Sequence, residues 1–184
     1  PSCAGRSVHR WGMSISQTVT RTRRKLADHI GATNASEVIF TPNATHSINQ
    51  VAAGIKWSRG DVVITSDREH NSNLVPWLQQ SIAGVKLQTV ESHPDNTFNL
   101  DAFEAACAEA GKSLRMVSLV HVGNLDGVEI PIREASKIAH DYGAIVHVDG
   151  AQSAPHMPII VEDLGCDLFS FSLHKMLGPT GVGA

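Results

Sequence analysis

An apolar run passes into a polar turn at Ala144-Ile145-Val146-His147-Val148-Asp149-Gly150-Ala151-Gln152. Its β-branched residues predict a strand at 144–148, and Asp149-Gly150 is typical of a turn. A second run, Leu168-Phe169-Ser170-Phe171-Ser172-Leu173-His174-Lys175, repeats this pattern, with a predicted strand at 168–172. Parallel strands bring their carboxyl ends to one edge of a sheet, and ligands bind there in open α/β proteins. We therefore expect Asp149 and Lys175 to face one crevice.

Similar strands occur upstream and alternate with segments of helical periodicity. Strands are predicted at 38–40, 62–65, 85–90 and 116–122, and helices at 14–30, 45–55, 74–82, 100–110 and 132–142. Asp101 and Glu104 have the spacing of a capping box, while Gly111 and Gly143 are expected to close the helices before them. The alternation predicts the α/β class, with a mostly parallel sheet between two helical layers.

Composition narrows the class of protein. The 184 residues are 42% hydrophobic and 18% charged, which suits a single domain over 1–184 with one core. A net charge of -3 gives no basic field for nucleic acid, and the apolar runs are too short for a membrane span. Three widely separated cysteines suggest neither a disulfide framework nor a zinc ribbon, so a cytoplasmic protein is expected.

The chemistry of the two polar turns points to one cofactor. Pyridoxal 5′-phosphate needs an amine for its Schiff base and an anion beside its ring nitrogen. Lys175 is predicted to form the Schiff base and then to move protons as a free amine. Asp149 is predicted to keep the ring nitrogen protonated, so that the ring withdraws electrons from the substrate carbon.

Motifs along nearly the whole chain resemble those of the class V aminotransferase family of fold-type I enzymes, especially its cysteine desulfurase and selenocysteine lyase branch. They are Thr41-Pro42-Asn43-Ala44-Thr45, Glu69-His70-Asn71-Ser72-Asn73-Leu74-Val75-Pro76-Trp77, His121-Val122-Gly123-Asn124, Asp149-Gly150-Ala151-Gln152-Ser153 and Phe171-Ser172-Leu173-His174-Lys175.

The resemblance implies a role for each matching residue. It implies that His70 stacks on the cofactor ring and that Gln152 and Asn124 contact the side of the ring that bears the hydroxyl. The implied phosphate site lies where a helix begins, so that backbone N–H groups and the positive helix end meet the anion. Its members are Ala44, Thr45, Ser172 and His174.

The sequence also departs from the family pattern. His46 stands where many relatives carry an acidic residue. The family's small C-terminal domain supplies an arginine for the substrate carboxylate and, in desulfurases, a cysteine on a mobile loop, and neither region occurs here. We therefore expect a partial large domain without the extreme N-terminal segment, in which 181–184 begins a further strand. Since family members are dimers, a homodimer or higher self-association is also expected.

Several functions stay open at this point. A desulfurase-type lyase acting on an amino acid is preferred, but class V transaminases, kynureninase-like hydrolases and epimerases share the same cofactor core. A catalytically incompetent, cofactor-binding module is a further alternative, because a site without half of its walls admits water and loses substrate orientation.

Simpler roles compete for individual residues. Asp149 alone could cap the turn into Gly150, His70 could cap the following helix, and Lys175 could be a solvated surface residue. A zinc site of His147, Asp149 and His174 fits by residue type but by no recognised spacing, and His147 is expected to be structural. The glycines at 178–183 lack the order of a nucleotide loop and predict a tight turn. Two of the cysteines, Cys107 and Cys166, are expected to be core thiols, whereas Cys3 has no informative context.

Overall fold

A computed structural model describes residues 8–184, so Cys3 lies outside the described residues. Its centre is a five-stranded sheet in which all pairs of neighbouring strands are parallel, in the order β2-β1-β3-β4-β5. The strands are β1 (Val62–Ser66), β2 (Lys86–Val90), β3 (Leu114–Val120), β4 (Ile145–Asp149) and β5 (Leu168–Ser170). The predicted parallel sheet is confirmed.

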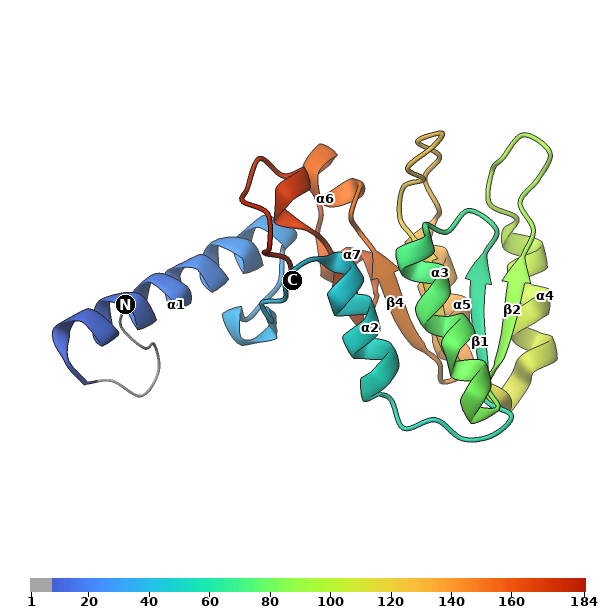
Figure 1. Cartoon of the computed structure of the whole chain (residues 1–184). Helices are drawn as coiled ribbons and strands as arrows, with labels where there is room; N and C mark the ends of the chain where they lie inside the picture. The colour runs from blue at the N-terminus through green and yellow to red at the C-terminus, as the bar shows by residue number, and fades with distance from the viewer. Residues whose placement is uncertain (1–7) are drawn as a thin grey trace.

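Helices cover both faces of this sheet (Figure 1). On one face, α4 (Leu100–Ala110) and α5 (Ile132–Asp141) bury Phe103 and Ile132 against Val146 and its neighbours. On the other, α2 (Ala44–Gly54) and α3 (Asn71–Gln79) bury Ile48 and Trp77 against the sheet. Removing these apolar side chains from water drives the layers together, and the predicted three-layer α/β/α arrangement is confirmed.

The N-terminal helix α1 (Arg10–Ile30) projects away from the sheet (Figure 1). Near its carboxyl end, Ile30 packs with Ile159 and Phe171. Within residues 8–184, no helix has both the length and the hydropathy required to cross a bilayer. The remaining elements are short: η1 (Ala35–Glu37), η2 (Gln80–Ala83), η3 (Gly111–Ser113), η4 (Leu173–Lys175), α6 (Ser153–His156) and α7 (Val161–Leu164).

Several local predictions were wrong. Helix α1 begins at Arg10, four residues before the predicted start at 14. Residues 38–40 form no strand, because the Val38 N–H and carbonyl bond to Ala35 and to the Arg23 side chain instead of a neighbouring strand. Helix α3 begins at Asn71, three residues before the predicted start at 74. The capping box is absent: Asn99 caps α4 by accepting the Ala102 N–H, which places Asp101 inside the helix.

The segment at 181–184 joins the sheet region, as expected for a further strand, but as isolated antiparallel bridges. Gly183 pairs with both Thr41 and Ser172, and so links the start of α2 to the turn after β5. A side chain at Gly183 would lie 2.7 Å from the Asn43 Cα, so this close approach requires glycine. The start of α2 and the turn that carries Lys175 are therefore held together through the backbone.

Candidate functional site

A cavity of about 230 Å³ opens at the carboxyl edge of the sheet, where β3 and β4 end and α2 and α3 begin. Its lining contains all nine site residues predicted from the sequence, namely Ala44, Thr45, His70, Asn124, Asp149, Gln152, Ser172, His174 and Lys175. Four further lining residues, Asn43, Ser72, Val120 and Ala151, were not predicted. The fold therefore gathers side chains from positions more than 100 residues apart at one place.

Asp149 is the last residue of β4 and is only 3% exposed. Its Oδ1 accepts the Ala151 N–H at 3.0 Å, so the predicted turn role is confirmed, while Oδ2 accepts no hydrogen bond within residues 8–184. Burial raises the pKa of the Asp149 carboxyl, whereas the Ala151 N–H and the charges of Lys175 and His70 lower it. A cation in the cavity would therefore stabilise the charged form of this buried carboxyl.

His70 precedes α3 and caps it, because its Nδ1 accepts the Ser72 N–H at 3.1 Å. The helix-cap role is therefore confirmed. Since Nδ1 is an acceptor, the ring proton of the neutral imidazole lies on Nε2. The cap also fixes the direction of an exposed ring that lines the cavity, next to Asp149 and Lys175.

Lys175 ends the 3₁₀ turn η4, three residues after the bridge at Ser172. Its N–H bonds to the Ser172 carbonyl, and the Gly178 N–H closes the turn on the Leu173 carbonyl at 2.9 Å. Its side chain is exposed, lines the cavity and forms no salt bridge in the described part of the chain. The amine is therefore accessible to a ligand and close enough to Asp149 to lower the pKa of that carboxyl.

The end of the cavity at the start of α2 is polar and lacks acidic side chains. The N–H of Ala44, the first residue of α2, donates to the Ser172 Oγ at 2.8 Å, and the hydroxyls of Thr45 and Ser72 lie 2.7 Å apart. Thr45 occupies the second helical position, whose N–H has no partner within a helix. This end can therefore hold an anion through hydroxyls, a free N–H and the positive helix end. His46 is not among the lining residues.

A row of buried polar side chains lies beneath the cavity. The Asn73 amide donates to Glu69 Oε2 at 2.6 Å, and its carbonyl accepts the Ser118 hydroxyl at 2.7 Å. Ser118 in turn contacts Nδ1 of His147 at 2.9 Å, and Nε2 of that ring contacts the Ser170 hydroxyl at 2.9 Å. Because the Ser118 proton goes to Asn73, His147 carries its own proton on Nδ1.

Sequence reasoning missed this row, although a signal was present. Glu69, Asn73 and Trp77 are spaced four residues apart, and this spacing places them on one face of a helix and of the residues just before it. Trp77 marks that face as the buried one, and its indole N–H also donates to the Asn73 carbonyl. Polar residues on the buried face of a helix require partners, and those partners lie on β3 and β4.

The zinc alternative does not fit the geometry. Both ring nitrogens of His147 are engaged by serine hydroxyls, and burial lowers the pKa of this ring to about 3. His147 is therefore a neutral, structural histidine, as predicted. In the part of the chain that the structure describes, no group of three or more His, Cys, Asp or Glu side chains is arranged to hold a metal ion.

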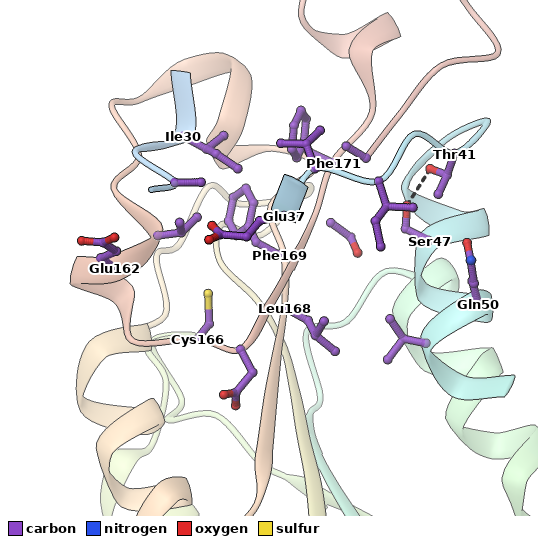
Figure 2. A pocket seen from close by; sticks show the side chains of 18 residues that line it. Ile30, Glu37, Thr41, Ser47, Gln50, Glu162, Cys166, Leu168, Phe169 and Phe171 are labelled. Carbon is purple, nitrogen blue, oxygen red and sulfur yellow. Dashed lines mark hydrogen bonds between the residues drawn. The ribbon is translucent and has the colours of Figure 1, made fainter. Parts of the chain in front are cut away.

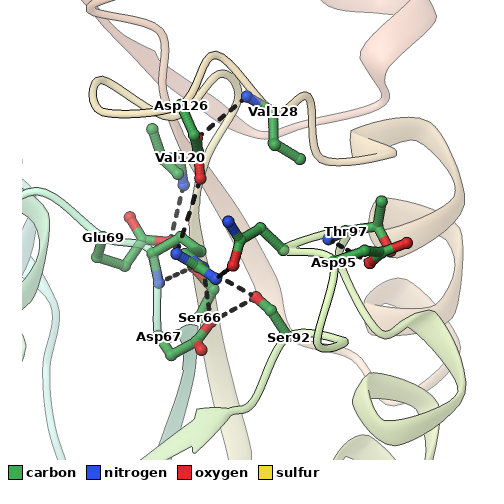
Figure 3. A network of polar contacts seen from close by, with 11 residues as sticks. Ser66, Asp67, Glu69, Ser92, Asp95, Thr97, Val120, Asp126 and Val128 are labelled. Carbon is green, nitrogen blue, oxygen red and sulfur yellow. Dashed lines mark hydrogen bonds and ion pairs between the residues drawn. The ribbon is translucent and has the colours of Figure 1, made fainter.

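Arg68 joins three loops near the cavity through its contacts with Asp67, Ser92 and Asp126. Figure 3 shows these three partners converging from separate loops. The guanidinium of Arg68 lies 3.8 Å from Asp67 and 3.7 Å from Asp126, and it also bonds to Ser92 and Asn96. These partners come from the loops that follow β1, β2 and β3. The loop at 121–131, which carries Asn124 to the cavity, is therefore anchored to its neighbours.

A second cavity, of about 510 Å³, lies beside the edge strand β5 (Figure 2). It contains none of the nine predicted residues, and its lining is largely apolar, with Ile30, Leu168 and Phe169 among it. Cys166 also lines it, but burial raises the pKa of this thiol to about 12, as it does for the buried Cys107. Neither thiol is a thiolate at neutral pH, which agrees with the predicted core role.

His147→Gln is expected to remove an acid-dependent loss of stability. In the unfolded chain, His147 binds a proton below about pH 6.5. In the folded chain, burial keeps this ring neutral down to about pH 3. The wild type therefore loses stability through this group as the pH falls, by about 2 kcal/mol between pH 7 and pH 5. Glu69, with its pKa raised to about 7, has the opposite effect in both proteins.

Urea unfolding at pH 7 and pH 5 measures this contribution, because the difference between variant and wild type cancels the effect of Glu69. The variant should gain about 2 kcal/mol relative to the wild type over that interval. A difference that does not change with pH would show that His147 is protonated normally in the folded chain.

Comparisons with known proteins agree with this geometry. Residues 2–184 match the family described as Aminotransferase class-V. A probable cysteine desulfurase of Halalkalibacterium halodurans is 41% identical over 182 residues, which cover 97% of this chain and 44% of that protein. The apo structure of a cysteine desulfurase from Thermococcus onnurineus has a TM-score of 0.91 and 38% identity, over 99% of this chain and 45% of its own. A cysteine desulfurase from Escherichia coli gives 0.85 and 31%, over 99% and 46%.

The fold and the cavity define an α/β domain with a ligand site at the carboxyl edge of a parallel sheet. Within that class, the chain belongs to the class-V aminotransferase family. It spans less than half the length of the relatives that it matches.

Proposed function

We propose that this chain binds pyridoxal 5′-phosphate through a Schiff base to Lys175 and forms the cofactor-binding part of a cysteine desulfurase-type enzyme. One observation carries the proposal: a buried carboxyl group and an accessible amine, from Asp149 and Lys175, line a single cavity, and the charge of Lys175 lowers the pKa of Asp149. Pyridoxal phosphate is a cofactor that requires both groups.

The residues present fit this cofactor at each of its three polar positions. Asp149 retains an unbonded Oδ2 and a carboxyl whose pKa burial raises, so a protonated ring nitrogen would supply the missing cation. Lys175 has no competing salt bridge among the described residues. The start of α2, with the hydroxyls of Thr45 and Ser72, suits the phosphate.

When bound, the cofactor supplies an electron sink for the carbanion of an amino-acid substrate. Asp149 would hold the proton on the ring nitrogen, and His70, fixed by its cap to α3, would lie against the face of the ring. Lys175 would carry the cofactor and, once released, accept and return protons at its Nζ. Gln152 and Asn124 would orient the ring hydroxyl, while Ser172 and His174 would complete the phosphate site.

The relatives favour cysteine as the substrate, because those compared above are named as cysteine desulfurases. The alternatives from class V chemistry are transamination, kynureninase-like hydrolysis and epimerisation, which use the same cofactor core. A domain that binds the cofactor without turnover is one further alternative. Self-association as a homodimer is also part of the proposal.

Incubation with pyridoxal phosphate followed by L-cysteine tests the function. With a thiol reductant present, sulfide and alanine should appear together, because the sulfur that leaves cysteine is at the oxidation level of a persulfide and the thiol supplies the two electrons that convert it to sulfide. L-alanine offered alone should give no sulfide. Formation of a keto acid with transfer of the amino group would support a transaminase instead. Cofactor binding without any product would favour the binding domain, and light scattering on the same samples would report the homodimer.

A further inference from the structure

Glu69 joins three elements beneath the cavity. Its Oε1 accepts the Ser66 hydroxyl at 2.6 Å and the Val120 N–H at 2.9 Å, and its Oε2 accepts the Asn73 amide at 2.6 Å. Figure 3 shows the carboxylate between the ends of β1 and β3. Glu69 does not line the cavity itself, but His70, the next residue, and Val120 both do.

The Asn73 amide is oriented by this carboxylate. Because its nitrogen donates to Glu69, its oxygen faces the Ser118 hydroxyl and the Trp77 indole, and both of these groups donate to it. An amide turned the other way would place its N–H groups against these two donors. The orientation of Asn73, and of the row that continues to His147, therefore depends on Glu69.

The strand register connects this row to the cavity. Ser118 of β3 is paired with His147 of β4, and two residues further along, Val120 is paired with Asp149. Alternate residues of a strand face the same side, so the row lies one layer below Val120 and Asp149. Glu69 thus holds the start of α3, with His70, against the strand ends that carry Val120 and Asp149.

We propose that Glu69 is a positioning residue that sets the spacing between His70 and Asp149, and hence the seat of the cofactor ring. The part that concerns the cofactor rests on the proposed function. Glu69 acts through its hydrogen bonds to other residues, since its carboxylate does not line the cavity. Burial raises the pKa of this carboxyl to about 7, so the ionised form, which accepts all three hydrogen bonds, predominates above that pH.

Glu69→Gln tests the proposal because it keeps the size of the side chain and removes one acceptor. The amide group that this substitution introduces would face the Asn73 amide, donor against donor, while its oxygen could still accept from Ser66 and Val120. The double variant Glu69→Gln with Asn73→Asp reverses the two roles and restores the hydrogen bond. It is therefore the matched control for the single variant.

The first readout is the affinity for the cofactor and the circular dichroism of the bound cofactor, both measured in folded protein well below the unfolding temperature. Glu69→Gln should bind pyridoxal phosphate about 10-fold more weakly, the equivalent of one buried hydrogen bond, with altered circular dichroism of the bound cofactor band. The double variant should recover both. A purely structural role would lower the unfolding temperature and leave the dichroism per bound cofactor unchanged, and that result would overturn the proposal.

The second readout, amide hydrogen exchange, needs no cofactor. In Glu69→Gln the N–H groups of Ser72 and Val120 should exchange faster, and the double variant should restore their protection. Unchanged exchange at both positions would refute the positioning role. If the wild type failed to bind the cofactor while exchange changed as expected, the proposed function would fail and the positioning of His70 would stand. If Glu69→Gln does not fold, Ser66→Ala takes its place, because it removes a single hydrogen bond to Glu69. The exchange rates should then change in the same direction but by less.

Discussion

Asp149→Asn is expected to weaken the binding of pyridoxal phosphate by about 100-fold, or about 3 kcal/mol, because a buried ring cation loses its anion. The unliganded protein should be equally or more stable at pH 8. Burial raises the pKa of Asp149, so its stabilising contribution is present at low pH and is lost as the pH rises through the folded pKa. Asparagine has no charge to bury and can still accept the Ala151 N–H.

Equilibrium titration with the cofactor and urea unfolding without it measure the two effects. Asp141→Asn is the matched control, because Asp141 ends α5 on the surface and lies before β4, at the opposite edge of the sheet. This control should change neither quantity appreciably. Equal cofactor affinity in Asp149→Asn and the wild type would show that Asp149 serves only its turn.

Lys175→Ala is expected to abolish the visible absorbance band of a Schiff base while leaving weak, reversible cofactor binding. The phosphate end and Asp149 remain, but the covalent link is lost. Spectrophotometric titration separates these outcomes, and Lys137→Ala on α5 provides a lysine control remote from the cavity. A band that persists in Lys175→Ala would place the Schiff base on another lysine.

Much of the fold and the lining of the site could be predicted from the sequence because both depend on local patterns. The apolar runs that became β1 and β4 are bounded by turns, and helix α5 ends before Gly143, which adopts a positive φ of 75°. In a parallel sheet the carboxyl ends of strands share one edge, so strand assignment alone brought Asp149 and Lys175 together. The motifs of the family added Ala44 and Thr45 of α2, and His70, which caps α3.

The remaining features depend on contacts between distant segments. Residues 38–40 have strand-like side chains, but their backbone pairs with a local turn and with Arg23, so no ladder forms. The hydroxyl of Ser72 reaches the cavity only because α3 starts earlier than its apolar periodicity suggests. The bond between Ser118 and His147 depends on strand register, which one sequence does not specify.

Borohydride reduction of the protein in the presence of pyridoxal phosphate, followed by mass spectrometry of its peptides, tests the central claim most directly. Reduction makes the Schiff base permanent, so the added mass should be found on the peptide that contains Lys175. It should be absent from the other five lysines, which are Lys25, Lys56, Lys86, Lys112 and Lys137. Modification of any of those five lysines in place of Lys175, or equal modification of all six, would contradict the assignment of this cavity as the cofactor site.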